Sequence, residues 1–192
     1  LGEFLRDEYI PAARETFGAS EHPDGKAFYD FMLGVMTTTD LTADQIHEIG
    51  LKEVARIRAE MMETIRRSDF MQTEHAREAQ SEGDERLFRA FLNYLRTDDR
   101  FYAKTEEDLL NAYRSAAKRI DAWMPRLFGT LPRLPYGVRE MPAFMAPSAP
   151  TAYYMSGNLD NGTAGFFVAN TYQLNTRPLF EGVALTLHAA VP

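Results

Sequence analysis

The strongest constraint in this sequence is a change of pattern at about residue 129. Before that point, apolar residues recur every three or four positions, which is the spacing of amphipathic helices. After it, prolines recur between residues 130 and 150, too closely for a long helix. The sequence therefore predicts a mainly α fold with a small β element, divided into a helical region at 1–129 and a second region at 130–192.

Caps and periodicity predict the first helices. Residues 1–17 are expected to form a helix that Pro11 kinks, and Asp24 can cap the next one. Thr42-Ala-Asp-Gln45 is a capping box that opens the longest helix, at 43–68. The apolar stripe of that helix is Ile46, Gly50, Val54, Ile57, Met61 and Ile65.

The rest of the first region contains two more helical patterns. Residues 71–84 are polar and predict a surface loop or a frayed helix. A helix is expected at 85–96. Another begins after Thr105, where three acids in the first turn oppose the positive end of the helix dipole, and runs to about residue 128.

The second region predicts a hairpin followed by a helix. A short strand is expected at 136–141. The runs Thr151-Ala-Tyr-Tyr-Met155 and Gly165-Phe-Phe-Val-Ala169 are rich in β-forming residues, and Asn161-Gly162 between them is a turn signal. Pro178 suits a first helical turn, and a helix is expected over 181–191.

Composition excludes several classes of function. The net charge of −7 argues against nucleic acid and anionic membrane surfaces as main partners. The sequence has no cysteine, which rules out disulfides and cysteine-ligated zinc. No apolar run approaches the roughly 20 residues of a membrane-spanning helix, so no transmembrane segment is expected. The compartment stays open between the cytoplasm and export.

One histidine, His188, is the main candidate for chemistry. It lies in the apolar run Leu185-Thr-Leu-His-Ala-Ala-Val-Pro192. In a zinc-hydrolase helix, a histidine ligand is followed by a glutamate that acts as general base for zinc-activated water. Here position 189 is Ala. Two interpretations stay open on the residues alone: a buried core histidine, or a zinc site that has lost its base and has its other ligands beyond residue 192.

The same run resembles the stretch Leu-Thr-Leu-His-Glu-Ala-Val-Pro-Gly-His-His of the DUF885 family, bacterial proteins grouped with the zincin metallopeptidases. The likeness covers nearly the whole chain. Its upstream motifs are Ala146-Pro-Ser-Ala-Pro-Thr-Ala-Tyr-Tyr154, Phe166-Phe-Val-Ala-Asn-Thr-Tyr172, Arg100-Phe-Tyr-Ala-Lys-Thr105 and Thr37-Thr-Thr-Asp-Leu-Thr42.

The resemblance implies a zincin-like catalytic region that hydrolyses peptide or related amide bonds with zinc. His188 would be a zinc ligand, with a histidine just after Pro192 and an acidic residue further on completing the site. Ala189 takes the place of the family's glutamate base. Loss of a general base typically costs about 10²–10⁴-fold in rate, so this form is expected to have little or no activity. The substitution has the pattern of an engineered change.

Five further polar residues are candidates for substrate binding, each with an ordinary structural role as the alternative. Tyrosine and asparagine can hydrogen-bond a peptide or an oxyanion, and arginine can pair with a carboxylate. They are Tyr153, Tyr154, Asn170, Tyr172 and Arg177. Zincins place an exposed strand beside the metal helix, where an extended peptide can pair through its main chain. Residues 166–170 are predicted to be that edge, or else part of a core hairpin.

Two other functions compete with the hydrolase. One is a non-catalytic helical binding or scaffold module, with His188 in its core and the hairpin as an interaction edge. The other is a pseudoenzyme, in which Ala189 is natural and the cleft binds peptides without cutting them. Both ends of the sequence look cut, so a fragment is expected. Its partners would be a peptide or small amide substrate and the remainder of the catalytic domain beyond Pro192.

Overall fold

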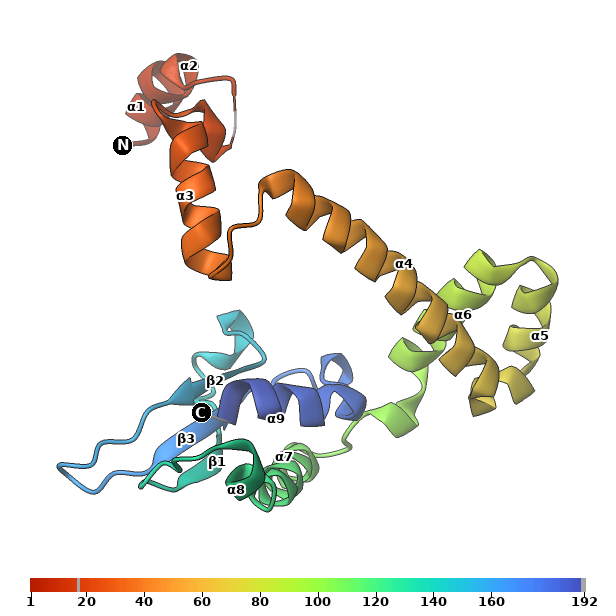
Figure 1. Cartoon of the computed structure of the whole chain (residues 1–192). Coiled ribbons are helices and arrows are strands. Elements are labelled where there is room, and N and C mark those ends of the chain that lie inside the picture. The colour runs from red at the N-terminus through yellow and green to blue at the C-terminus, as the bar shows by residue number, and fades with distance from the viewer. Residues whose placement is uncertain (17, 191–192) are drawn as a thin grey trace. The chain divides into compact units, whose positions relative to one another are not determined.

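The computed structural model describes residues 1–16 and 18–190, and the chain divides into two compact units, Leu1–Ser68 and Asp69–Pro192. Helices dominate both units, and the second also contains a three-stranded sheet (Figure 1). The predicted mainly α fold with a small β element is therefore confirmed. Residue 129 lies within the second unit, and the interpretation of 1–129 and 130–192 as two regions of one incomplete domain stays a prediction. Phe17 and Val191, which the sequence places in helices, lie outside the described residues.

The N-terminal helix is shorter than predicted. It consists of α1 (Gly2–Phe4), a π-helical turn (Leu5–Tyr9) and α2 (Ile10–Ala12), and Ala13 after it is extended. Pro11 lies inside this continuous helix, where it has no N–H to donate, and the helix ends one residue after it, at Ala12. The helix therefore continues past the proline for less than one turn.

The next two helices differ in how they begin. Helix α3 (Gly25–Thr37) follows Asp24, whose backbone is left-handed and whose side chain caps nothing, so the predicted Asp24 cap is wrong. Helix α4 (Ala43–Arg67) has the predicted capping box. The backbone N–H of Gln45 donates to Thr42 Oγ1 at 3.3 Å, and Thr42 N–H donates to Gln45 Oε1 at 2.9 Å. Capping groups thus fix the start of α4 but not that of α3.

The second unit opens with a helical pair: α6 confirms the helix predicted at 85–96, and α5 is a regular helix where the sequence predicted a loop or a frayed helix. A 3-10 turn (Asp69–Gln72) leads into α5 (Glu74–Ser81), which packs against α6 (Asp84–Thr97). Thr73 caps α5 by accepting a hydrogen bond from the Ala76 N–H at 3.2 Å. This cap, together with the buried Phe70, makes the polar segment a regular helix.

Helix α7 (Glu106–Asp121) begins at the predicted start. Thr105 and Asp108 form a full capping box, which adds a reciprocal side-chain bond to the acid-rich first turn. The helix ends at Asp121, and α8 (Met124–Leu127) is a separate short helix with Pro125 in its first turn. The single helix predicted to residue 128 is therefore two helices.

The sheet has the strand order β1-β3-β2. Its strands are β1 (Tyr136–Glu140), β2 (Ala152–Met155) and β3 (Gly165–Ala169). The predicted hairpin is confirmed, because β2 and β3 pair in antiparallel fashion. β1 pairs parallel to β3 on its other side, so β3 is the central strand. The prediction that residues 166–170 form an exposed edge is wrong for this reason.

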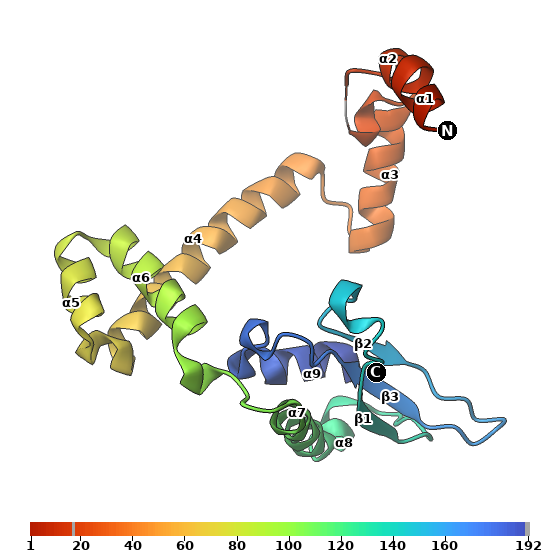
Figure 2. The ribbon, with the colours of Figure 1, turned by 180° about the vertical axis from the view of Figure 1, so that it is seen from behind.

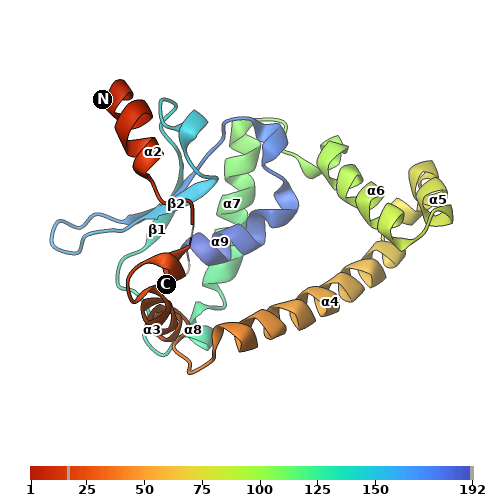
Figure 3. The same cartoon turned by 90° about the horizontal axis from the view of Figure 1, so that it is seen from above.

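Helices α7 and α9 (Gly182–Ala190) cover one face of the sheet. Figure 3 shows them crossing each other, and Figure 2 shows α7 nearly end-on next to α9. The core between them contains Leu109, Tyr113, Phe167 and Ala190. A smaller cluster around Val168 lies on the opposite face. This packing fixes the C-terminal end of α9, where His188 and Ala189 lie, against the sheet.

Among the residues that the structure describes, no helix is both long and apolar enough to cross a membrane.

Candidate functional site

His188 is exposed in the last turn of α9. The interpretation of His188 as a buried core histidine is therefore wrong. Its neighbours in the helix, Thr186 and Ala190, are the residues that face the core. Within 1–16 and 18–190, no group of three or more His, Cys, Asp or Glu residues could hold a metal ion. His188 is thus one accessible donor, and the described residues do not form a complete zinc site by themselves.

Ala189, the next residue, lines a pocket of about 460 Å³ at the end of the sheet. We call it the tyrosine pocket, because Tyr136 of β1 and Tyr154 of β2 form its wall on the sheet side. The loop after α8 contributes Leu131 and Leu134, and Met124 closes another side. Ala189, the position at which the sequence predicts a missing base, therefore faces a cavity large enough for a small ligand group.

Strand register explains why two tyrosines from different strands meet there. Tyr136 pairs with Gly165 of the central strand, and Tyr154 pairs with Phe167. Since side chains alternate along a strand, both tyrosines point to the face that carries α7 and α9. Gly165 has no side chain to place between them, and the two rings lie 6.3 Å apart at 67°.

The tyrosine pocket is apolar except for a few groups. The Tyr136 hydroxyl is buried and has no hydrogen-bond partner among the described residues. Burial is the main cause that raises the pKa of Tyr136, and the nearby Asp121 and Tyr154 raise it further. Asp121 is the one charged side chain among the residues that line this pocket. Tyr136 therefore stays neutral at physiological pH and keeps a proton that it can donate.

Tyr153 lies apart from the tyrosine pocket. As the neighbour of Tyr154 on β2, it points to the other face of the sheet. There it packs against the cluster of Val168, Met141 and Ala146. Of the two predicted tyrosines in β2, only Tyr154 shares a cavity with position 189.

The Asn170 side chain is fully buried and organises the proline-rich loop. Its amide nitrogen donates to the carbonyl oxygens of Ala146 (2.8 Å), Pro150 (3.1 Å) and Ala149 (3.3 Å). Its side-chain oxygen accepts the Tyr172 N–H at 2.9 Å. All polar atoms of this side chain are therefore engaged within the protein, and its role as a substrate ligand stays a prediction.

Tyr172 and Arg177 also lie away from the tyrosine pocket. Tyr172 is exposed. Arg177 donates from Nη1 to Thr151 Oγ1 at 2.9 Å, while its Nε is buried without a partner among the described residues. The Arg177 charge lowers the pKa of Tyr113 against the larger raising effect of burial. Arg177 thus joins the segment before α9 to the start of β2.

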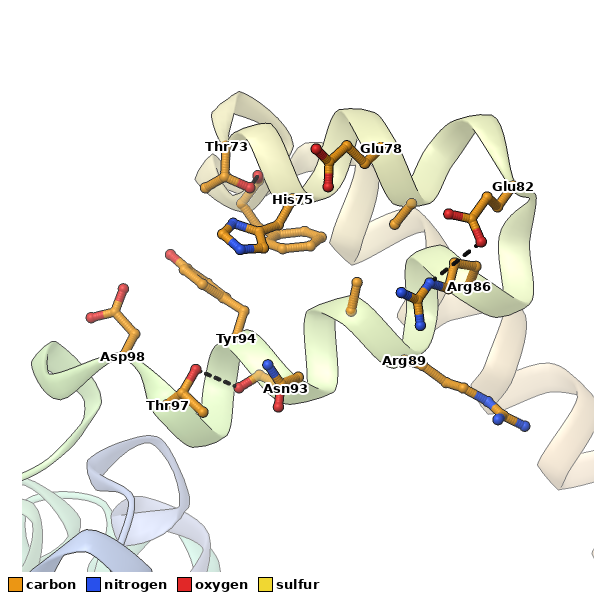
Figure 4. A pocket seen from close by; sticks show the side chains of 13 residues that line it. Thr73, His75, Glu78, Glu82, Arg86, Arg89, Asn93, Tyr94, Thr97 and Asp98 are labelled. Carbon is orange, nitrogen blue, oxygen red and sulfur yellow. Dashed lines mark hydrogen bonds and ion pairs between the residues drawn. The ribbon is translucent and has the colours of Figure 1, made fainter.

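A second pocket, of about 570 Å³, lies between α5 and α6 (Figure 4). Charged side chains surround it, and Arg86 and Glu82 form an exposed ion pair across 3.6 Å. His75 and Glu78 project toward it from α5. None of the residues that the sequence singled out as functional lines this pocket, so the tyrosine pocket is the better candidate site.

Comparison with known proteins identifies the family. The family model described as "Bacterial protein of unknown function (DUF885)" matches residues 1–192. The chain belongs to the DUF885 family. The DUF885 chain is also similar to a crystal structure described as "the putative lipoprotein from Colwellia psychrerythraea", with 26% sequence identity and a TM-score of 0.75. The match covers 100% of this chain but 31% of that one, so this chain spans about a third of the length of its structural relative. No curated protein matches.

Sequence reasoning missed Tyr136, Leu131 and Leu134 of this DUF885 chain as pocket residues. The signal for Tyr136 was available, because a strand was expected at 136–141 and alternation gives Tyr136 and Val138 the same face. The sequence does not show which strand pairs with β1. Only the parallel pairing of β1 with β3 brings Tyr136 to Tyr154 and Ala189.

Proposed function

We propose that this protein is part of a zinc-dependent hydrolase of peptide or related amide bonds, inactive in this form because position 189 is Ala. One observation carries the proposal: the accessible His188 immediately precedes a residue that lines a substrate-sized pocket. His188 does not line the pocket itself, and its side chain leaves the helix about 100° round the axis from that of Ala189. The proposal therefore places the metal beside the pocket, on the adjoining face of α9. The family match is compatible with this activity but does not name one.

The residues have distinct roles in this proposal. The His188 imidazole would hold the metal, and two further ligands would come from polypeptide beyond residue 192. Zinc, when bound, lowers the pKa of water to about 7 and polarises a carbonyl group. Ala189 has no group that can take up a proton, so the base that the family pattern supplies at this position is missing.

The sheet offers a place for an extended substrate. β2 is an edge strand that pairs only with β3 among the described strands, and it packs against α9. An extended peptide can pair with such an edge through main-chain hydrogen bonds. Tyr154 on β2 would then point from this edge toward the tyrosine pocket. The outer edge of β2 therefore replaces residues 166–170 as the proposed peptide-binding edge.

Zinc binding by the full-length protein encoded by the gene tests the metal site. We expect about one zinc per molecule with either Ala or Glu at position 189. His188→Ala should remove most of that zinc, whereas His75→Ala, a matched change at another exposed histidine, should not. Equal zinc content in both variants would contradict a ligand role for His188.

Ala189 itself favours the pseudoenzyme as a second candidate function. In that case the natural gene carries an alanine codon at position 189, and the cleft binds peptides without cutting them. A glutamate codon in the gene would exclude a natural pseudoenzyme and leave the inactivated hydrolase.

A further inference from the structure

We infer that the tyrosine pocket binds an uncharged, apolar side chain of the substrate, preferably aromatic, next to the bond that reacts. Tyr136 would donate a hydrogen bond to a polar atom of the same ligand. This inference rests on the proposed function for the position of the reacting bond. The binding of the side chain can be measured without any metal.

The lining of the tyrosine pocket determines what fits. Met124, Leu131, Leu134 and the flanking prolines present aliphatic carbon, and Tyr154 adds an aromatic ring. Apolar walls with a few convergent polar groups are typical of ligand sites, and a volume of about 460 Å³ suits one large side chain with part of its backbone.

Charge narrows the choice of ligand. Among residues 1–16 and 18–190, Asp121 is the one charged residue that lines the tyrosine pocket, and it forms an exposed ion pair with Lys118 at 3.5 Å. In the same part of the chain, no basic side chain lines this pocket to neutralise an acidic ligand. An acidic side chain would lose hydration on entry and meet a carboxylate, so we expect it to be rejected.

Tyr136 is the polar anchor in this inference. Buried hydroxyl groups normally have a partner, and the Tyr136 hydroxyl has none among the described residues. Tyr136 lines the tyrosine pocket, but its hydroxyl is buried, so a ligand reaches it only when a neighbouring part of the wall moves. A bound ligand that offers an acceptor would supply the partner. Tyr154 is 42% exposed, so its side chain is the part of the wall that can rotate to admit the ligand.

Calorimetric titration with blocked amino-acid amides tests the inference. The probes are N-acetyl-phenylalanine amide, N-acetyl-alanine amide and N-acetyl-aspartate amide, each titrated into the full-length protein in the presence of a metal chelator. We expect the phenylalanine probe to bind at least about tenfold more tightly than the alanine probe, because burying a large apolar side chain is favourable. We expect no measurable binding of the aspartate probe. Equal binding of all three, or no binding of the phenylalanine probe, would overturn the inference.

Two variants locate the binding. Ser156→Phe should fill the pocket mouth and abolish binding, whereas Ser148→Phe, an exposed serine outside the tyrosine pocket, should leave it unchanged. Tyr136→Phe should weaken binding about five- to tenfold while the melting temperature stays the same or rises, since an unpartnered hydroxyl is removed. Unchanged affinity in Ser156→Phe would overturn the proposed location of the binding site. Unchanged affinity in Tyr136→Phe would overturn the proposed hydrogen bond from Tyr136 to the ligand.

Failure of this inference is distinguishable from failure of the proposed function. Selective binding of the phenylalanine probe without zinc binding would support the tyrosine pocket as a ligand site and contradict the hydrolase. Zinc bound through His188 without binding of the phenylalanine probe would support the metal site of the hydrolase and contradict the tyrosine pocket as a ligand site.

Discussion

Tyr154 of β2 places its hydroxyl oxygen over the backbone of Gly165 on β3, in the space that a Cβ atom at position 165 would occupy. Gly165 is the partner of Tyr136 in the parallel pair. The absence of a side chain on the central strand therefore allows one tyrosine to lean across the sheet toward the other. The tyrosine pocket depends on this glycine as much as on its own lining.

Substituting two nearby glycines should have unequal effects. In Gly165→Ala, the new Cβ meets the end of an exposed side chain, which can move, so we expect a loss of about 1 kcal/mol in the free energy of unfolding. In Gly157→Ala, it would lie 2.6 Å from the Thr163 carbonyl oxygen and 2.7 Å from the Gly165 nitrogen. Backbone atoms cannot move aside as readily as the end of a side chain, so we expect a loss of about 3 kcal/mol in the free energy of unfolding. Urea denaturation measures which substitution lowers the free energy of unfolding more. A larger loss in Gly165→Ala than in Gly157→Ala would contradict the placement of Tyr154.

Asn170 should be a stability determinant. Asn170→Ala removes the donor that serves three loop carbonyl groups and the acceptor for the Tyr172 N–H. Because these groups would be left buried without a partner, we expect a loss of about 3 kcal/mol in the free energy of unfolding. Asn175→Ala, at an exposed asparagine, is the matched control and should change it by less than about 0.5 kcal/mol. A loss for Asn170→Ala as small as that of the control would show that the amide does not hold the loop.

Two tyrosines should make the folded state sensitive to alkaline pH. Burial is the largest cause of the raised pKa of both Tyr113 and Tyr136. The pKa in the unfolded chain is about 10, so their contribution to stability is complete below that pH and is lost as the pH rises toward the folded pKa. Tyr136→Phe removes an unpartnered hydroxyl and should raise the free energy of unfolding by about 1 kcal/mol at pH 7.

Urea unfolding at pH 8 and at pH 11 measures this effect. The stability of Tyr136→Phe should fall less between the two pH values than that of the unsubstituted protein. Absorbance titration near 295 nm should show Tyr113 and Tyr136 ionising above the ordinary tyrosine pKa of about 10. An identical fall in stability for both proteins would contradict the burial of the Tyr136 hydroxyl.

The sequence predicted features that depend on neighbouring residues. The capping box at Thr42 and the helix start at Thr105 depend only on residues of one helical turn. The structure has both, and it adds a full capping box at Thr105. The hairpin of β2 and β3 was predictable for the same reason, since two β-rich runs flank a turn signal at Asn161-Gly162. Local chemistry decides these elements, so local patterns find them.

Features that depend on distant residues were not predictable. The parallel pairing of Tyr136 with Gly165 joins strands 29 positions apart, and no periodicity specifies it. Without that pairing, the sequence leaves β3 open between an exposed edge and part of a core hairpin, and it does not connect Tyr136 with position 189. The sequence also cannot show the structural role of Asn170, because the loop carbonyls that accept from its amide are brought to it only by folding.

The rate of amide hydrolysis by the zinc-loaded full-length protein tests the central proposal most directly. The comparison is between Ala189, Ala189→Glu and Ala189→Gln, with a p-nitroanilide of N-acetyl-phenylalanine as substrate. The proposal predicts turnover with Glu at least about 10²-fold faster than with Ala or Gln, and its loss in the double variant Ala189→Glu, His188→Ala. Equal rates for the three residues at full zinc occupancy, or turnover that survives the loss of His188, would contradict it.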